Sequence, residues 1–234
     1  MPGSGRLAGL AGFGKLHTVS TPSPQAPSVS SPVRVIVFAK EPVAGRVKTR
    51  LAPMLGAGGA AAMHATLTER TLKTAVDAAP GAVELCCTPD DLHPVLTDLA
   101  NRLGAQLAAQ GPGNLGDRMA RAFARSLAGR QPVIIVGTDC PALSAAYIRQ
   151  AADALAGGVD AVLGPAEDGG YVLIGLRRFV ARLFDGIDWG GADVCDTQRH
   201  RLAEAGFRWE ELPTLWDVDR PTDLDRYEAY LRES

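Results

Sequence analysis

Short, strongly apolar runs alternate with helical patterns along most of the chain. The most apolar run, Val133–Val136, is rich in β-branched residues and ends at Gly137, which is typical of a strand buried on both faces of a parallel sheet. We expect further strands at residues 33–39, 83–88 and 105–109, and in the two arms of a hairpin within 160–175.

Helical patterns fill the intervals between these runs. Ser144 is well placed to cap the helix that follows the central strand. The expected helices cover residues 57–79, 92–103, a stretch ending near 128, 144–156, 193–205 and a last stretch ending near 231. Strands and helices in this alternation predict an α/β fold with a mainly parallel sheet and helices on both of its faces.

The first 32 residues differ from the rest of the chain. They are rich in Gly, Ser, Thr and Pro and contain no acidic residue, which is typical of a disordered tail. Their apolar stretch at residues 7–13 is shorter than a secretory signal requires, whereas a transit peptide or a mis-assigned start codon is an alternative. We therefore expect a disordered extension at 1–32 and one folded domain at 33–234.

Composition narrows the function classes. The chain has 234 residues, 46% of them hydrophobic, and a formal net charge of −2, so it lacks the basic excess of a general nucleic-acid or membrane-surface binder. Its four cysteines form no CxxC motif and no zinc-type spacing, which indicates a reducing, cytoplasmic location and no structural metal site. Oligomeric state is not encoded in any of these features.

Asp139 stands at the carboxyl end of the expected central strand, where open α/β sheets bind their ligands. A carboxylate there can hold Mg²⁺ or Mn²⁺, and the cation can hold phosphates. Alternatively, Asp139 only closes the turn between strand and helix by accepting backbone hydrogen bonds. This stretch alone does not separate the two interpretations.

A basic segment without regular periodicity follows the first expected strand. Basic side chains in a loop at this edge of a sheet suit a polyphosphate, although an ordinary solvated loop is the alternative. The candidate nucleotide-binding residues of this loop are Lys40, Gly45, Arg46, Lys48 and Arg50. His64, in the next helix, we interpret as a surface or packed histidine.

Two glycine-rich turns supply further candidates. Gly116, Asp117 and Arg118 open a helix, where the backbone can approach a nucleotide, although on its own Asp117 is better explained by the helix N-terminus. Asp168 precedes two glycines in an acidic turn that also suits an ordinary hairpin. Asp217, near the C-terminus, is not easily explained by helix capping.

Four segments, together with Asp217-Val-Asp219, resemble the radical-SAM/selenodomain-associated transferases, some of which are labelled arsenosugar-biosynthesis glycosyltransferases. The segments are Phe38–Pro42 with Gly45–Leu51, Leu115–Met119, Gly137–Leu143 and Leu163–Gly175. The resemblance covers the chain from about residue 33 onward. It implies a GT-A-like, Rossmann-type three-layer sandwich of the nucleotide-diphospho-sugar transferase superfamily, which also includes guanylyltransferases.

The resemblance also implies roles for single residues. Lys48 and Arg50 would cradle nucleotide phosphates, and Asp139 would match the metal-holding, catalytic aspartate of the superfamily. Asp168 and Asp217 would contribute acceptor contacts or a second metal contact, with Asp168 as the further catalytic residue and Asp217 as the further metal ligand. The chain departs from the Asp-x-Asp motif of many GT-A glycosyltransferases at Pro141, and Ala39-Lys-Glu-Pro replaces the glycine-rich loop of the nucleotidyltransferases.

The leading hypothesis is a Mg²⁺- or Mn²⁺-dependent glycosyltransferase that uses a nucleotide sugar and a small-molecule acceptor, with neither nucleic acid nor membrane as a partner. In it, Asp168 orients or deprotonates the acceptor hydroxyl. The alternatives are a nucleotidyltransferase that releases pyrophosphate, and a nucleotide-binding module without catalysis.

Overall fold

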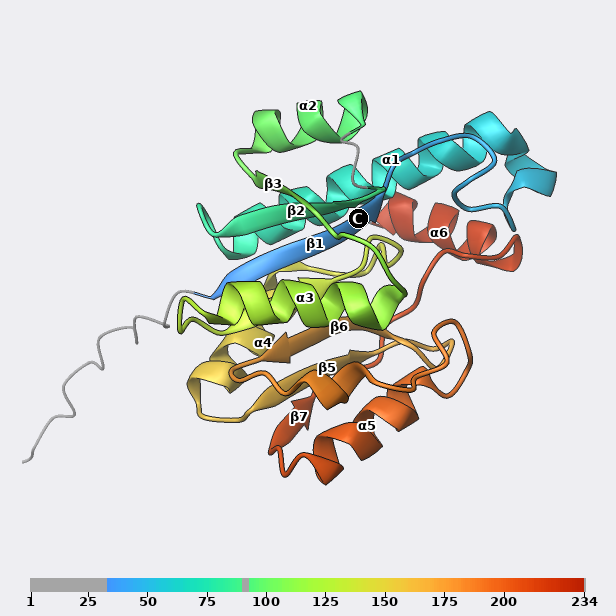
Figure 1. Cartoon of the computed structure of the whole chain (residues 1–234). Coiled ribbons are helices and arrows are strands. Elements are labelled where there is room, and N and C mark those ends of the chain that lie inside the picture. The colour runs from blue at the N-terminus through green and yellow to red at the C-terminus, as the bar shows by residue number, and fades with distance from the viewer. Residues whose placement is uncertain (1–32, 90–92, 234) are drawn as a thin grey trace, which may run out of the picture.

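A seven-stranded sheet forms the centre of the protein in the computed structural model, which describes residues 33–89 and 93–233 (Figure 1). The strand order is β3-β2-β1-β4-β6-β5-β7. The strands are β1 (Arg34–Lys40), β2 (Val83–Thr88), β3 (Gln106–Ala109), β4 (Val133–Val136), β5 (Ala161–Pro165), β6 (Tyr171–Leu176) and β7 (Trp209–Glu211). The predicted extension at 1–32 lies outside the described residues.

Only β6 runs against the other strands of this sheet. It pairs antiparallel with both β4 and β5, whereas β1–β2, β1–β4, β2–β3 and β5–β7 are parallel pairs. The expected hairpin within 160–175 is therefore confirmed as β5–β6. The sequence did not predict β7, because three residues show no periodicity of their own; its parallel pairing with β5 defines it.

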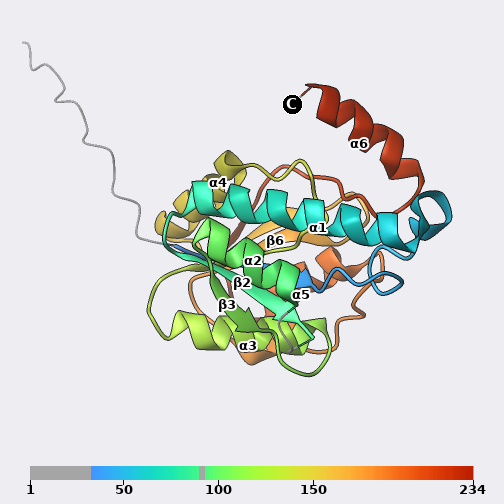
Figure 2. The ribbon, with the colours of Figure 1, turned by 90° about the horizontal axis from the view of Figure 1, so that it is seen from above.

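Helices cover both faces of the sheet, so the predicted three-layer α/β fold is confirmed. Helices α1, α2 and α4 pack on one face and α3, the 3-10 helix η1 and α5 on the other, as Figure 2 shows for α1, α4 and α3. The bounds are α1 (Ala52–Ala78), α2 (Pro94–Leu103), α3 (Leu115–Leu127), α4 (Ala145–Ala156), η1 (Ala181–Phe184), α5 (Val194–Glu204) and α6 (Thr222–Glu233). Ser144 caps α4, as predicted, by accepting from the backbone N–H of Tyr147.

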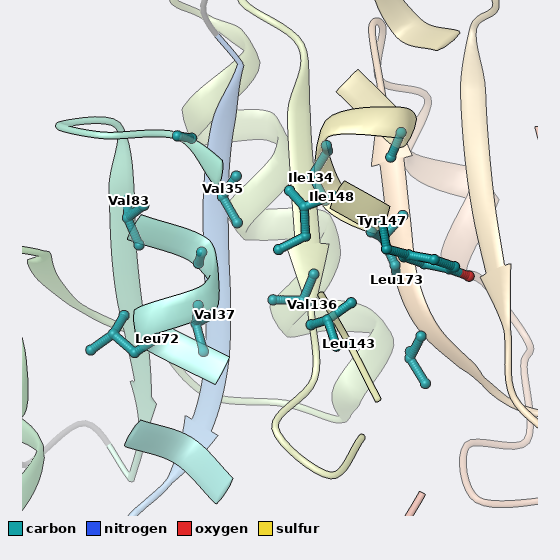
Figure 3. Packing of buried hydrophobic residues seen from close by; sticks show 14 of the residues in the cluster. Val35, Val37, Leu72, Val83, Ile134, Val136, Leu143, Tyr147, Ile148 and Leu173 are labelled. Carbon is teal, nitrogen blue, oxygen red and sulfur yellow. The ribbon is translucent and has the colours of Figure 1, made fainter. Parts of the chain in front are cut away.

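Alternating side chains of the central strands supply the two cores. On β1, Val35 and Val37 face α1 and α4, whereas Ile36 and Phe38 face α3. Figure 3 shows the first of these cores, where Leu72 of α1 packs over β1 and neighbouring residues. Each fully buried aliphatic side chain contributes roughly 1.5–3 kcal/mol relative to an exposed one, so both faces of β1 and β4 anchor the sheet.

Helix α1 begins five residues before the predicted helix and is kinked at Gly56. Gly56 has φ 70° and ψ 162°, outside the helical region, a conformation that glycine adopts without steric cost. The predicted helix at 57–79 therefore corresponds to the regular part of α1. The short first turn projects from the body beside the basic loop, with Met54 largely exposed.

A third apolar cluster fixes the C-terminal segment against α1. Leu51, Leu67, Trp216, Val218 and Tyr227 are buried together. In addition, the backbone N–H of Val218 donates to the carbonyl oxygen of Asp139 at 2.9 Å. Two segments that are almost 80 residues apart in the sequence thus meet at the end of β4, which brings Asp217 beside Asp139.

Candidate functional site

The carboxyl ends of β1 and β4 open into a cavity of about 750 Å³, which we call the first cavity. Its walls come from the basic loop after β1, the N-terminal end of α3 and the turn after β4. Most of the predicted cationic residues and the central aspartate line it: Lys40, Arg46, Lys48, Arg50, Arg118 and Asp139. With Asp219 added, five cationic and two carboxylate side chains line this cavity, which makes it basic.

Asp139 lies at the junction of the basic loop and the C-terminal segment. Its side chain is half exposed, and Oδ1 lies 2.5 Å from Nζ of Lys48. Because Lys48 occupies one carboxylate oxygen, the other oxygen is left for a ligand. Asp139 therefore does more than close a turn: it carries a charged contact at the ligand edge of the sheet.

Lys48 is buried, although its position in a loop allowed a solvated side chain. Its side chain is only 3% exposed, and Nζ also donates to the carbonyl oxygen of Val218 at 2.5 Å. Its backbone has φ 47°, in the left-handed region that residues other than glycine rarely adopt. The solvated-loop alternative is thus wrong for Lys48, which links the basic loop, β4 and the C-terminal segment.

The other candidate nucleotide-binding residues of this loop are exposed. The guanidinium group of Arg50 pairs with Asp219, and that of Arg46 pairs with Glu41 at 3.1 Å. Gly45 has φ 79° and provides the turn that the loop requires, without lining the first cavity. Arg46 and Arg50 are therefore the residues of this loop that can exchange a weak, solvent-screened partner for phosphate.

A second cavity of about 370 Å³ adjoins the first. The two share Arg50, Gly190 and Asp219 as lining residues, so one opening leads into the other. Asp168 and Asp217 line the second cavity and not the first. Oδ1 of Asp168 accepts from the backbone N–H of Gly170 at 2.9 Å, so the hairpin-turn alternative also describes Asp168 correctly.

Asp217 carries the least compensated charge at the junction. Its Oδ1 atom is buried and has no hydrogen-bond partner among the residues that the structure describes. Burial, together with the negative charges of Asp139 and Asp168, raises its pKa to about 7. A buried carboxylate beside other carboxylates is a site where a cation stabilises the charged form.

The fit of a divalent cation rests on Asp139 and Asp217. Within residues 33–89 and 93–233, no group of three or more His, Cys, Asp and Glu side chains forms a complete metal site. Mg²⁺, however, usually takes one or two carboxylates and completes its shell with water and substrate phosphates. The unpartnered oxygen of Asp217 beside the half-exposed carboxylate of Asp139 fits this pattern.

Gly116 and Asp117 have local structural roles. The carboxylate of Asp117 accepts from the backbone N–H of Asn114, and the Asn114 side chain accepts from the N–H of Asp117, which forms a capping box on α3. At Gly116, a Cβ atom would lie 2.6 Å from Nε1 of Trp189. Among the described residues these two stay outside the lining of the first cavity, whereas Arg118 reaches it and donates to Thr88 at 3.2 Å.

Sequence reasoning missed several residues of the first cavity. His64 is buried, its Nε2 bonds the carbonyl oxygen of Lys40 at 3.0 Å, and burial lowers its pKa. The helical spacing from Ala60 through His64 to Leu67, all on the buried side of α1, could have placed it there. Gln110 ties the ends of β1 and β2 together by donating to the carbonyl oxygens of Ala39 and Cys86, a contact that no local pattern encodes.

Taken together, the sheet order, the single antiparallel β6 and the cavity at the carboxyl ends define the nucleotide-diphospho-sugar transferase fold. A crystal structure of a candidate nucleotide-diphospho-sugar transferase from Desulfovibrio desulfuricans G20 is similar, with a TM-score of 0.73 at 28% identity over 87% of this chain and 98% of that one. The sequence profile described as "Uncharacterized protein conserved in bacteria (DUF2064)" matches residues 71–191, more than half of the chain, so the protein belongs to this family.

More distant structures share the fold alone. One is 4-diphosphocytidyl-2C-methyl-D-erythritol synthase from Anaerococcus prevotii, with a TM-score of 0.58 at 12% identity over 87% of this chain and 97% of that one. Another is glucosyl-3-phosphoglycerate synthase from Mycobacterium tuberculosis in complex with Mn²⁺ and UDP, with a TM-score of 0.50 at 14% identity over 86% and 76%. No curated protein matches the sequence. No described helix has the length and apolar character needed to cross a bilayer.

Proposed function

We propose that this protein is a divalent-metal-dependent glycosyltransferase that moves a sugar from a nucleotide sugar to a small acceptor. The observation that carries the proposal is the pair of carboxylates, Asp139 and Asp217, at the junction of a basic and an acidic cavity. Such a junction suits a transfer reaction in which the charged leaving group of the donor lies in the first cavity and the acceptor lies in the second.

The first cavity would hold the nucleotide diphosphate. Arg46, Arg50 and Arg118 line it with guanidinium groups, which pair with phosphate oxygens through two donors at once. The short distance from Lys48 to Asp139 supports a positioning role for Lys48: it holds the carboxylate in place from the buried side. The Lys48 ammonium group donates to the carbonyl oxygen of Val218 and forms an ion pair with Asp139, and it adds a positive charge to the lining of the first cavity.

Asp139 and Asp217 would hold a Mg²⁺ or Mn²⁺ ion, which would supply charge neutralisation for the departing diphosphate. The basic side chains of the first cavity add to this stabilisation. On the other side, Asp168 would accept the proton of the attacking hydroxyl group, because it lines the second cavity and only its Oδ1 atom is occupied by the turn.

Nucleotidyl transfer is the competing function. The TM-score is 0.58 for 4-diphosphocytidyl-2C-methyl-D-erythritol synthase and 0.50 for glucosyl-3-phosphoglycerate synthase, at 12% and 14% identity. The fold alone therefore favours neither reaction. The two reactions release different products. Glycosyl transfer releases a nucleoside diphosphate from a nucleotide sugar, whereas nucleotidyl transfer releases pyrophosphate from a nucleoside triphosphate.

A product screen tests the proposal. The purified protein is incubated with Mn²⁺ or Mg²⁺ and with panels of nucleotide sugars and nucleoside triphosphates, and both products are measured. We expect metal-dependent release of nucleoside diphosphate that stops with EDTA and in Asp139→Asn, but continues in the control Asp153→Asn, an exposed residue of α4 that lines neither cavity. Pyrophosphate release in its place would select the competing function.

A further inference from the structure

The second cavity has a charge distribution that restricts its ligand. Five carboxylates and three guanidinium groups line it, so its formal charge is −2, whereas the lining of the first cavity is basic. Because the two cavities share Arg50, Gly190 and Asp219, a ligand in the second cavity is adjacent to a donor in the first. If the proposed function holds, the second cavity is where the acceptor binds.

Two of the three guanidinium groups already have carboxylate partners. Arg226 makes two hydrogen bonds to Glu167, at 2.7 and 3.0 Å, and its guanidinium group also lies over the ring of Trp216 at 4.4 Å. Arg50 pairs with Asp219, and in the proposed function it turns to the diphosphate of the donor in the first cavity. The third, Arg220, is exposed, and with all three guanidinium groups counted the lining still holds two more carboxylates than guanidinium groups. A bidentate pair held against an aromatic ring is pre-organised, so Arg226 offers little to a phosphate or carboxylate of a ligand.

Free acceptor capacity in the second cavity remains at Asp168. Its contact with the Gly170 N–H uses only Oδ1, so the other carboxylate oxygen can accept from a ligand, whereas Asp217 is taken by the cation of the proposed function. Ionised carboxylates accept hydrogen bonds and donate none. A donor complex in the first cavity would not change this balance, because the charges of a divalent cation and a diphosphate largely cancel.

We infer that the acceptor is a small molecule without phosphate or carboxylate groups that presents several hydroxyl or amino groups, such as a polyol, a neutral sugar or an amino sugar. Its N–H and O–H groups would donate to Asp168 and to neighbouring carboxylates, whereas an anionic acceptor would meet like charge. In the transfer, the acceptor oxygen bonds to the anomeric carbon, and its proton passes to the Asp168 carboxylate. The bond from that carbon to the phosphate oxygen breaks, and the nucleoside diphosphate leaves with the electron pair.

Matched acceptor pairs test this inference on the full chain with Mn²⁺ and each of UDP-glucose, GDP-mannose and dTDP-glucose. The pairs are glycerol with glycerol 3-phosphate and glucosamine with glucosamine 6-phosphate. The measurement is the increase in nucleoside diphosphate release over the rate without acceptor. We expect the unphosphorylated member of at least one pair to stimulate release about tenfold more than its partner, since one unfavourable like-charge contact is worth at least this factor. The inference is overturned if the phosphorylated members stimulate release as much as their partners or more. It is also overturned if no member of either pair stimulates release.

A variant gives a second readout. Glu167→Gln keeps the shape of the side chain but frees the Arg226 guanidinium group, so the preference for the unphosphorylated acceptor should narrow several-fold. The matched control is Glu228→Gln, an exposed residue on the same helix as Arg226 that lines neither cavity, and it should leave the preference unchanged. The same preference in Glu167→Gln and the wild-type protein would contradict the role given to the Glu167–Arg226 pair.

Failure of this inference is distinguishable from failure of the proposed function. Thermal stabilisation by UDP with Mn²⁺, and slow hydrolysis of the nucleotide sugar without acceptor, report on the binding and cleavage of the donor and do not require an acceptor. If both are present and phosphorylated acceptors are preferred, the acceptor class is wrong and glycosyl transfer stands. If both are absent and nucleoside triphosphates yield pyrophosphate, the proposed function itself is wrong.

Discussion

The two cavities lie side by side at one edge of the sheet but differ in the state of their charged groups. In the first cavity the cations outnumber the carboxylates, and Arg46 and Arg50 are exposed with single, screened partners. In the second the carboxylates outnumber the cations, and Arg226 is held by Glu167 and Trp216. The position of both cavities follows from the carboxyl edge of the sheet, whereas the chemistry that each cavity offers to a ligand follows from the pairing of its charged groups.

The largest effect is expected at the junction, for Asp139→Asn. Loss of a metal-holding charge removes several kcal/mol of transition-state stabilisation, so the transfer rate should fall about a thousandfold. Stabilisation by nucleotide with Mn²⁺, measured as the shift in Tm, should disappear as well. A wild-type Tm shift in this variant would remove Asp139 from the metal site.

Asp139→Asn also leaves the buried Lys48 ammonium group without its carboxylate, so part of any loss could reflect the fold. The double variant Asp139→Asn with Lys48→Met removes both members of the pair and controls for this. We expect it to recover unfolding stability relative to Asp139→Asn while the Tm shift with nucleotide and Mn²⁺ stays absent. Recovery of the shift would show that the pair, and not the metal, is what Asp139 serves.

A change in the second cavity should separate acceptor chemistry from donor binding. Asp168→Asn keeps an oxygen for the turn contact with Gly170 but cannot take a proton, so transfer should fall about a hundredfold, as expected for the loss of a general base. The affinity for the nucleoside diphosphate, measured by calorimetry, should stay within a factor of two or so of the wild type. Equal losses in both measurements would contradict the division of roles between the cavities.

Lys48 and Arg50 belong to one loop but should contribute different amounts to the free energy of unfolding. Lys48→Met leaves Asp139 and the Val218 carbonyl oxygen without their buried partner, and should cost about 2–3 kcal/mol. Arg50→Met removes an exposed pair and should cost less than about 1 kcal/mol. Urea denaturation measures both costs, and comparable values would show that burial of Lys48 does not matter for the fold.

Local patterns predicted the fold well but treated Lys48 and Arg50 as equivalent. Strands such as Val133–Val136 are specified by their own apolar runs, and the fold follows from their alternation with helices. The burial of Lys48 depends instead on Val218, which lies 170 residues further along the chain. Contacts between such distant segments are set by packing, so the sequence named Asp139 and Asp217 as candidates without showing that they meet.

His64 and Gly116 also show that local sequence patterns do not reveal contacts between distant segments. His64 stands on the buried stripe of α1, so its burial could be predicted, but not that the helix delivers it to the first cavity. Gly116 follows a glycine-rich turn, which favoured a ligand contact. The structure explains it by the Trp189 ring, which belongs to a loop about 70 residues later in the sequence.

The smallest expected effect concerns this packing of Gly116. In Gly116→Ala the new Cβ would lie 2.6 Å from Nε1 of Trp189 and 2.8 Å from the carbonyl oxygen of Phe184, so the loop around Trp189 must shift. We expect a loss of about 1–3 kcal/mol in unfolding stability, as for other overpacked sites. Trp189 and Gly190 line the first cavity and Gly190 lines the second, so affinity for the nucleoside diphosphate should also fall.

Gly58→Ala is the matched control, because Gly58 lies exposed in α1 and a Cβ there meets nothing within 4 Å. Alanine is favoured over glycine in a helix by roughly 0.5–1 kcal/mol, so this variant should be neutral or slightly more stable. If Gly116→Ala behaved like Gly58→Ala in both stability and nucleotide affinity, the loop that carries Trp189 would not be held by α3. The boundary between the basic and the acidic cavity would then depend on the charged side chains alone.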